Sequence, residues 1–235
     1  MSNGVKAWSY SALALYEKCP HQYAHKKVWK TPHVDEPGPA LIHGRRVHGG
    51  AAAFIIGKPY FDEQNKTTYT EDMLFEAKKI GHFEQSFLEL KLMSPAIEQQ
   101  WGFTKDMRPT GWFAKDTHYR AILDAGVLYG DNYYDVIDYK TGKAYFENEE
   151  QMEQFATVVF ARYPQVHTVG TRLWYLDSGV EDKAEYKKSD AAAIQSKWNA
   201  RSAPMFIDTE FRPRPGDHCR WCDFARSKGG KCKFG

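Results

Sequence analysis

Two acids and a lysine stand within an apolar stretch at residues 119–142. They are Asp124, Asp138 and Lys140, and the runs that carry them are rich in Ile, Leu, Val and Tyr. Turn-forming residues around Asp131 separate the runs, which predicts a β-hairpin whose two carboxylates are cross-strand neighbours about 5 Å apart. A divalent cation would relieve their repulsion, because hard cations favour carboxylate oxygens. Lys140 projects from the same strand face as Asp138. Two acids and a lysine around one metal ion suit hydrolysis of a phosphodiester.

A buried salt bridge is the structural alternative for the same residues. Lys140 could pair with Asp124 or Asp138 without any metal ion, and the local sequence leaves both interpretations open. In the metal-dependent interpretation, the carboxylates hold Mg²⁺ or Mn²⁺, which lowers the pKa of a bound water. Lys140 would then orient or deprotonate that water, or stabilise the pentavalent phosphorus centre.

The elements that must position these residues follow from apolar periodicity and turn signals. Their order, with helices first and then alternating strands and helices, favours an α/β fold around a mixed sheet. The predicted helices are residues 8–26 with a break near Cys19 and Pro20, 40–56, 70–92 capped by Thr70, 147–163, and 189–200 capped by Ser189. The predicted strands are 95–104, 119–129, 133–139, 166–176 and 180–187, with a loop at 31–39, a turn at 105–111 and an irregular segment from 204.

The composition is that of an ordinary globular protein with many aromatic rings. Of 235 residues, 42% are apolar, 26% are charged and 15% are aromatic. The net charge of +2 is too small to indicate a nucleic-acid partner by itself, although both ends of the chain are locally basic. No apolar run approaches the roughly 20 residues of a membrane span, and the N-terminus lacks the pattern of a secretory signal. We therefore expect a cytoplasmic protein that does not contact membranes.

The segment from Asp124 to Gly142 resembles the catalytic core of the PD-(D/E)XK nuclease superfamily. In the RecB-like branch this core reads roughly G-x-x-D and then D-[YW]-K-[TS]-G. Here residues 138–142 read Asp-Tyr-Lys-Thr-Gly, and residues 121–124 read Ala-Ile-Leu-Asp, with Ala where the family often has Gly. The branch also has a Gly-x-x-x-His motif, matched by residues 44–48, and a Gln-x-x-x-Tyr motif, matched by residues 151–155 with Phe for Tyr.

The resemblance implies a role for each matching residue, within a restriction-endonuclease-like core. The implied ligands of Mg²⁺ or Mn²⁺ are His48, Asp124, Asp138 and the backbone carbonyl of Tyr139, with Glu98 on the preceding strand as a further candidate. The implied catalytic residues are Asp124, Asp138, Lys140 and Gln151, where Gln151 would hold the lysine or the DNA backbone and Gln154 is its alternative.

The four cysteines of the chain form the second candidate site. By spacing alone, Cys219 and Cys222 indicate a zinc knuckle or a redox pair. One N-terminal Cys-Pro, at Cys19, together with three C-terminal cysteines resembles the iron–sulfur nucleases of the same branch, among them the CRISPR-associated four-cysteine nucleases and the AddB type. The resemblance implies a [4Fe–4S] cluster held by four thiolates. The nine residues between Cys222 and Cys232 exceed the interval expected for the family, which keeps zinc as the alternative, with His218 as a substitute ligand.

The resemblance extends from residue 9 to residue 232 and implies one nuclease domain at residues 1–235. Residues 40–200 would form the catalytic core, and residues 1–30 with 205–235 would form a cluster-binding subdomain. The implied activity is a metal-dependent DNA exonuclease that acts on single-stranded ends in recombination, repair or replication, and its expected source is a phage or mobile element. No nucleotide-binding G-x-x-x-x-G-K-[ST] motif is present, so the protein would be a stand-alone nuclease or would act with a separate helicase, recombinase or single-strand-binding partner. The candidate DNA-binding residues are Arg45, Arg46, Tyr23, Trp221 and Arg220.

Two other functions remain as alternatives. A structure-specific endonuclease, or an endonuclease of CRISPR adaptation, would use the same acids and lysine. A non-catalytic DNA-binding module with an iron–sulfur or zinc site would need only the cysteines, and the intact hairpin argues against it.

Overall fold

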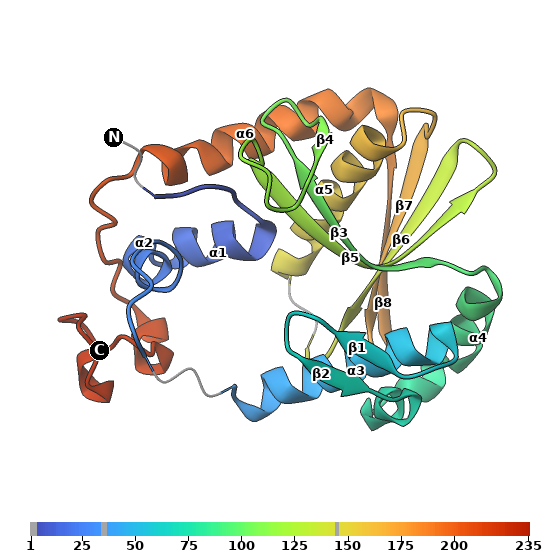
Figure 1. Cartoon of the computed structure of the whole chain (residues 1–235), viewed down its shortest axis with the longest axis horizontal. Helices are drawn as coiled ribbons and strands as arrows, with labels where there is room; N and C mark the ends of the chain where they lie inside the picture. The colour runs from blue at the N-terminus through green and yellow to red at the C-terminus, as the bar shows by residue number, and fades with distance from the viewer. Residues whose placement is uncertain (1–3, 34–36, 144–145) are drawn as a thin grey trace.

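A six-stranded mixed sheet forms the centre of the computed structural model, which describes residues 4–33, 37–143 and 146–235. Its strand order is β4-β3-β5-β6-β7-β8 (Figure 1). Strands β6 and β7 are parallel, and the other neighbours are antiparallel. The predicted α/β fold, a mixed sheet flanked by helices, is confirmed. The strands are β3 (Ala96–Phe103), β4 (Pro109–Thr110), β5 (Tyr119–Tyr129), β6 (Tyr133–Lys140), β7 (Thr168–Tyr175) and β8 (Val180–Lys187).

The hairpin of β5 and β6 has the predicted register. Its pairs run from Tyr129 with Tyr133 to Ala125 with Ile137, so the turn is centred on Asp131. Asp124 and Asp138 come directly after the last of these pairs, one on each strand. The turn chemistry therefore sets which residues of the two strands meet.

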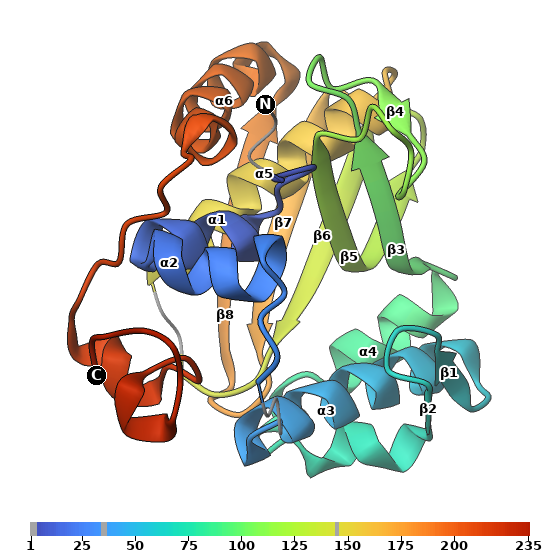
Figure 2. The ribbon, with the colours of Figure 1, turned by 60° about the vertical axis from the view of Figure 1, so that its left-hand side comes forward.

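Helices cover both faces of the sheet and define two apolar cores. Helices α1 (Tyr10–Lys18), α5 (Phe146–Arg162) and α6 (Ala191–Ile207) lie on one side, and α3 (Pro39–Ile56) and α4 (Glu84–Leu92) lie on the other (Figures 1 and 2). The first core contains Leu13, Val136 and Val158, and the second contains Val47, Phe87 and Tyr139. No described helix has the length and apolar character needed to cross a membrane.

Helix α3 lies unusually close to the segments that follow it, because glycine occupies two contact positions. A Cβ atom on Gly50 would lie 2.2 Å from the backbone nitrogen of Leu74, and one on Gly49 would lie 2.2 Å from the ring of Tyr69. Pro39 begins the helix, where its missing N–H costs nothing. Gly57 ends it in the left-handed conformation, with φ 69°.

The N-terminal helix breaks where Cys19 and Pro20 predicted it. Ser9 caps α1 by accepting a hydrogen bond from the N–H of Ala12, and Cys19 is extended between α1 and α2 (Pro20–Tyr23). A π-helical turn follows at Ala24–Val28. The predicted loop at residues 31–39 is described only in part, because residues 34–36 lie outside the described residues.

The predicted helix at residues 70–92 is confirmed only in its last part, where α4 spans Glu84–Leu92. Two short 3-10 helices, Glu71–Glu76 and Ile80–His82, precede α4. The chain turns extended at Ala77, with ψ 132°, because the first 3-10 segment packs against α3 rather than continuing along one axis. A small hairpin of β1 (Tyr60–Asp62) and β2 (Thr67–Tyr69) precedes it and was not predicted.

Helix α6 extends beyond the helix predicted at residues 189–200. Helix α6 continues through Pro204 to Ile207. Ser189 does not cap it: this residue lies in a 3-10 turn, and its hydroxyl donates to the carboxylate of Asp190 at 3.0 Å. The segment after α6 is irregular, as predicted, apart from short 3-10 turns.

Candidate active site

In the neighbouring strands β3 and β5, the alternation of side chains between the two faces of the sheet is interrupted at Glu98 and Asp124. Residues two apart in a strand normally share a face, yet Leu123 belongs to the first core and Ala125 to the second. The register of β3 with β5 omits Glu98 and Asp124, and Glu98 has a positive φ of 48°. This conformation is strained for a residue with a side chain, and such strain is concentrated at functional sites.

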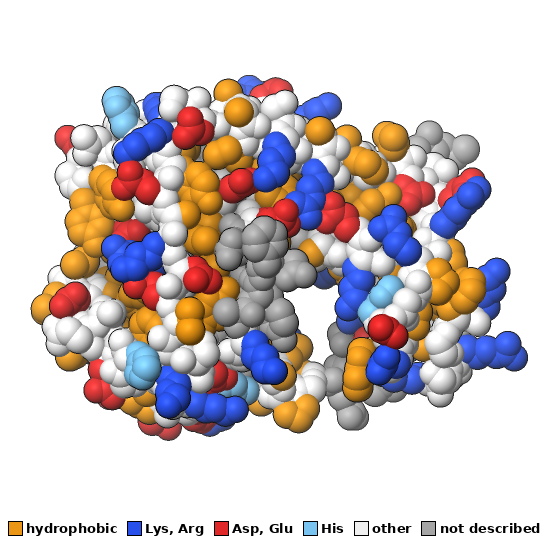
Figure 3. Space-filling model, turned by 180° about the vertical axis from the view of Figure 1, so that it is seen from behind, with side chains coloured by type: hydrophobic (Ala, Val, Ile, Leu, Met, Phe, Trp, Pro, Cys, Tyr) orange, Lys and Arg blue, Asp and Glu red, His pale blue; other side chains and the backbone are white. Residues whose placement is uncertain are grey.

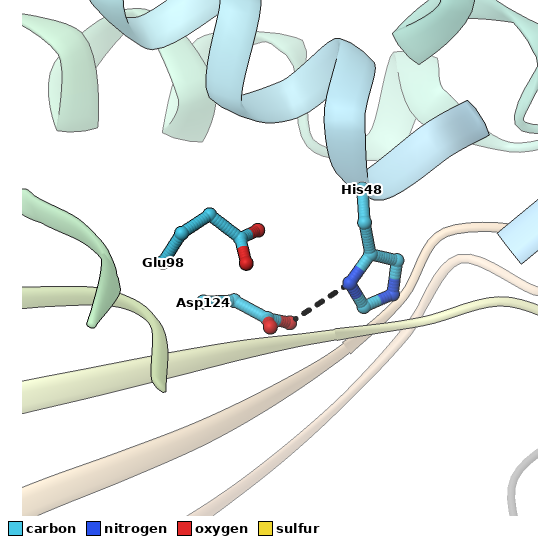
Figure 4. A group of neighbouring side chains, drawn as sticks. All are labelled: His48, Glu98 and Asp124. Carbon is cyan, nitrogen blue, oxygen red and sulfur yellow. Dashed lines mark ion pairs between the residues drawn. The ribbon is translucent and has the colours of Figure 1, made fainter. Parts of the chain in front are cut away.

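Helix α3 brings His48 to these two carboxylates. His48, Glu98 and Asp124 each offer a ligand atom within 4.8 Å of the others, and no other group of three His, Cys, Asp or Glu among the described residues does so. The His48 Nδ1 lies 3.2 Å from Asp124 Oδ2, and Figure 4 shows the three side chains pointing toward one another. The Tyr139 N–H donates to Asp124 Oδ2 at 2.7 Å. Nitrogen and oxygen donors in this arrangement fit a hard divalent cation.

The glycine of the Gly-x-x-x-His motif has a steric role in this arrangement. A Cβ atom on Gly44 would lie 3.2 Å from Thr141 Oγ1, just beyond the end of β6. Gly44 lies one helical turn before His48 and so on the same face of α3. The absence of a side chain at Gly44 lets α3 lie against the end of β6 and keeps His48 beside Asp124.

Asp138, Lys140 and Gln151 form the second half of the site. The Nζ of Lys140 lies 2.5 Å from Asp138 Oδ2 and donates to Gln151 Oε1 at 2.9 Å. The ion pair of the structural alternative is therefore present, and so is the predicted hydrogen bond from Lys140 to Gln151. The ion pair does not account for the remaining charge, because Glu98 and Asp124 add two carboxylates and His48 offers them a single cation at most.

The pKa values of the site record this excess of negative charge. Burial, and after it the charge of Asp124, raises the pKa of Glu98 to about 8. Burial also raises the pKa of Asp138 to about 6 against the opposing effect of Lys140. Burial alone would lower the pKa of His48, but Asp124 outweighs it and raises the value to about 9. The pKa of Lys140 is likewise raised, since Asp138 outweighs its burial. Protons on these groups occupy the place that a metal ion would take.

Asp177, in the turn between β7 and β8, holds three segments of the site together and was not identified from the sequence. Its carboxylate accepts from the N–H of Lys78 at 2.9 Å and from the N–H of Gly142 at 3.0 Å, and it lies 3.0 Å from His43 Nε2. Burial would raise the pKa of Asp177, but these partners lower it below its usual range. The carboxylate thus ties α3, through His43, to the segment that follows Lys140. An isolated turn aspartate gives no sequence signal for this role.

The other predicted residues are dispersed. Gln154 is buried and accepts from the hydroxyl of Tyr119, so it does not reach Lys140. Tyr23, a candidate DNA-binding residue, is 3% exposed and packs on Tyr16, so its ring is not open to a nucleic acid. Two of the predicted DNA-binding arginines are committed to ion pairs, Arg46 with Glu76 and Arg220 with Asp217. Arg45 is exposed and lines a hollow that His48 also lines. Trp221 is 73% exposed.

The four cysteines meet in one region without forming a close group of sulfur atoms. Cys19, Cys219, Cys222 and Cys232 line a single small cavity of about 10 Å³, which His218 also lines. No three of their sulfur atoms lie within 4.8 Å of one another. Tetrahedral zinc would hold its sulfur ligands about 3.8 Å apart, so this arrangement is not a zinc site. The room corresponds to about one water, so the predicted [4Fe–4S] cluster is not supported by the geometry.

The affinity for Mn²⁺ should rise with pH. Binding must displace the protons that His48 and Glu98 hold, with pKa values of about 9 and about 8, so acid competes with the metal ion. We expect a rise of about tenfold per pH unit or more between about pH 6 and about pH 8, measured by calorimetry. Glu98→Gln should reduce this slope, whereas Glu185→Gln on the exposed face of β8 should leave it unchanged. An affinity that does not vary with pH would contradict the assignment of these ligands.

Loss of the Asp177 carboxylate should weaken the metal site without unfolding the protein. The side-chain amide of Asp177→Asn cannot accept from both N–H groups and pair with His43, so α3 loses part of its tie to the end of β6. Removing such a supporting partner commonly costs about 10- to 100-fold in metal affinity, and we expect a loss of this size for Mn²⁺. Asp131→Asn at the exposed hairpin turn is the matched control. Equal affinity in the two variants would show that Asp177 does not position the site.

Two solved structures are similar to this chain. A solved structure described as a putative exonuclease from Eubacterium rectale is similar with a TM-score of 0.51 and 13% identity, over 92% of this chain and 87% of that chain. The crystal structure of SSO0001 is similar with a TM-score of 0.44 and 12% identity, over 97% of this chain and 86% of that chain. No curated protein sequence matches the chain. At these identities the likeness of structures concerns the fold alone.

The family itself is shown by the sequence match. The model of the PD-(D/E)XK nuclease superfamily matches residues 7–227, a span that contains His48, Glu98, Asp124, Asp138 and Lys140. This match covers nearly the whole chain, and the protein belongs to the PD-(D/E)XK nuclease superfamily.

Proposed function

We propose that this protein is a divalent-metal-dependent DNA exonuclease of the RecB-like type that acts on single-stranded ends. Membership in the superfamily implies a hydrolase that cuts nucleic acid and uses divalent metals. The observation that carries the proposal is the convergence of His48, Glu98 and Asp124 within 4.8 Å, next to the ion pair of Asp138 with Lys140.

His48, Asp124, Asp138 and the carbonyl of Tyr139 would hold the metal ion, with Glu98 as a further ligand. The bound ion would neutralise the scissile phosphate and lower the pKa of a water. Asp124 is oriented for this by the Tyr139 N–H at 2.7 Å, and its charge is retained because His48 lowers its pKa. Asp124 on β5 is thus held by Tyr139 on β6, and His48 on α3 is held by Asp124.

Lys140 would stabilise the charge that develops on the phosphate. Asp138 raises the pKa of its ammonium group above the ordinary value, which supports a protonated lysine near neutral pH. A protonated amine donates hydrogen bonds and cannot accept a proton, so charge stabilisation is favoured over general base catalysis. Gln151 accepts from Lys140 at 2.9 Å and would aim it at the phosphate.

The finer features of the proposal come from the resemblance to the RecB-like branch. Single-stranded ends would reach the site from a helicase, recombinase or single-strand-binding partner. An endonuclease that recognises DNA structure or acts in CRISPR adaptation is the alternative, since it would use the same hydrolytic groups. A phage or mobile-element origin is part of the same proposal.

Hydrolysis should require Asp138 and Lys140 and should begin at strand ends. We expect Mn²⁺ or Mg²⁺ to support stepwise degradation of a labelled linear single strand, followed on denaturing gels. Asp138→Asn and Lys140→Ala should each reduce the rate by about 100-fold or more, because each removes charge that acts in the transition state. Lys187→Ala, an exposed substitution on β8, is the control.

Circular single strands separate the two enzymatic proposals. An exonuclease leaves them intact, whereas an endonuclease cuts circles as fast as linear strands. Full hydrolysis by Asp138→Asn would remove the site assignment altogether. Binding of DNA without hydrolysis under any metal would favour a non-catalytic module.

We also propose that the cysteine-lined cavity is a metal-cofactor site, with a [4Fe–4S] cluster as the first candidate and zinc as the second. The support is that Cys19, from the N-terminal helices, shares one cavity with three cysteines more than 190 residues away (Cys219, Cys222 and Cys232). In a cluster each thiolate binds a different iron, so the sulfur atoms lie farther apart than around zinc. The present cavity is too small for the cluster and the sulfur atoms are too dispersed for zinc, so either metal would require the four cysteines to rearrange. Residues 1–30 and 205–235 would then act as one cluster-binding subdomain beside the catalytic core at 40–200.

Anaerobically purified protein should contain about four irons per chain and absorb visible light by charge transfer. Cys19→Ser should lower both the iron content and the melting temperature, because it removes the ligand that joins the two ends of the chain. Ser227→Ala, in the same segment but outside the cavity, is the control. Colourless protein with one zinc per chain would favour the second candidate, and protein without either metal would dismiss the cofactor site.

A further inference from the structure

A hollow of about 310 Å³ opens beside the metal-ligand group, between α3 and the β1–β2 hairpin. Its lining includes Leu41 and Arg45 from α3, Tyr60 and Tyr69 from the hairpin, and His48 and Glu98 from the site itself. Figure 2 shows the hairpin lying alongside α3. A volume of this size is at the lower limit for a small-molecule site, and a substrate bound in it would contact the metal ligands.

Tyr69 and Tyr60 give this hollow a firm aromatic wall. Tyr69 is buried, and its ring fits against Gly49, where a Cβ atom would lie 2.2 Å from it. Tyr60 is its cross-strand partner and is only partly buried. Tyr60 lines the hollow together with His48 and Glu98, and the buried Tyr69 lies directly across from it on the neighbouring strand.

Leu41 and Arg45 on α3 complete the lining. Leu41 is 51% exposed, so it offers apolar surface that the fold does not use. Arg45 is exposed and, within the described residues, forms no ion pair, in contrast to Arg46, whose guanidinium is committed to Glu76. The carboxylate of Asp62, which also lines the hollow, accepts hydrogen bonds from the backbone of Gln64 and Asn65. Arg45 is therefore an exposed cation of the hollow, and its charge also acts on Asp62, whose pKa it helps to lower.

We propose that this hollow binds the nucleobase of the nucleotide next to the scissile phosphate, with the base stacked on Tyr60 and the adjoining phosphate on Arg45. A base has a flat apolar face and a neighbouring negative charge, and the hollow offers an aromatic wall, an apolar side chain and an exposed arginine. A base inside a duplex is paired and stacked on its neighbours and would have to leave the helix to enter. The hollow therefore selects unpaired strands. This inference rests on the proposed nuclease function and deepens it.

The experiment measures binding of a fluorescent single strand by anisotropy, with Ca²⁺ occupying the carboxylate site and strand integrity checked on gels. Tyr60→Ala should weaken binding by about tenfold, a typical effect of removing one stacking ring. Tyr60→Phe should bind as the unmodified protein does. Phe61→Ala is the matched control, because Phe61 is 48% exposed and points from the opposite face of β1.

A strand with one abasic nucleotide, moved along the sequence, tests the stacking itself. At one position of the abasic nucleotide, the unmodified protein should bind the abasic strand about tenfold more weakly than the intact strand. Tyr60→Ala should bind the two strands equally, because the ring that the base would stack on is absent. Additive losses would overturn the proposal, and so would equal binding by Tyr60→Ala and the unmodified protein. If Tyr60→Ala does not fold, quenching of a 2-aminopurine base at that position in the unmodified protein replaces it, and absence of quenching overturns the proposal.

Failure of this inference is separable from failure of the proposed function. If Asp138→Asn abolishes hydrolysis while Tyr60→Ala binds normally, the base-binding hollow is wrong and the nuclease stands. If Asp138→Asn hydrolyses DNA at the full rate, the proposed active site is wrong whatever Tyr60 does.

Discussion

Three carboxylates concentrated at one point are the constraint on which the site depends. Glu98, Asp124 and Asp138 share their surroundings with two groups that can carry positive charge, His48 and Lys140. Buried charge is stable only when it is paired, and one carboxylate remains in excess even when both groups are protonated. The fold therefore concentrates negative charge and strain where a cation can compensate them, and a site without a cation must retain protons instead.

The sheet brings these carboxylates together because the side chains of β3 and β5 do not alternate regularly between its two faces. An uninterrupted β5 would place Leu123 and Ala125 in the same core, and β3 would not need a positive φ at Glu98. The interruption aims Glu98 and Asp124 at His48 on α3, while Asp138 pairs with Lys140 on β6. Asp177 then joins α3 to the segment after β6. Local irregularity in two strands and one distant turn residue are thus parts of a single arrangement.

Strong local signals predicted the larger elements well. The hairpin turn at Asp131, the break at Cys19 and Pro20, and β8 at residues 180–187 agree with the structure, because turn chemistry and proline act on their own neighbours. The segment at 70–92 failed for the opposite reason. Its apolar spacing suited one continuous helix, but close packing of the chain around Leu74 against Gly50 of α3 accompanies two short 3-10 helices before α4. Tertiary packing there outweighed helix propensity.

The sequence by itself predicted the fold class and the candidate hydrolytic residues, because Asp124, Asp138, Lys140 and the Gly-x-x-x-His motif match a nuclease family in residue type and spacing. Only the tertiary structure shows which further residues lie beside them. Glu98, a candidate from the sequence, reaches His48 from an irregular strand. Asp177 is tied to the site by hydrogen bonds to residues 35 and 99 positions away, and Tyr60 lines the same hollow as His48 because its hairpin packs on α3. Tyr23 is withdrawn into the core. Such contacts depend on the summed packing of distant segments, which no local pattern encodes.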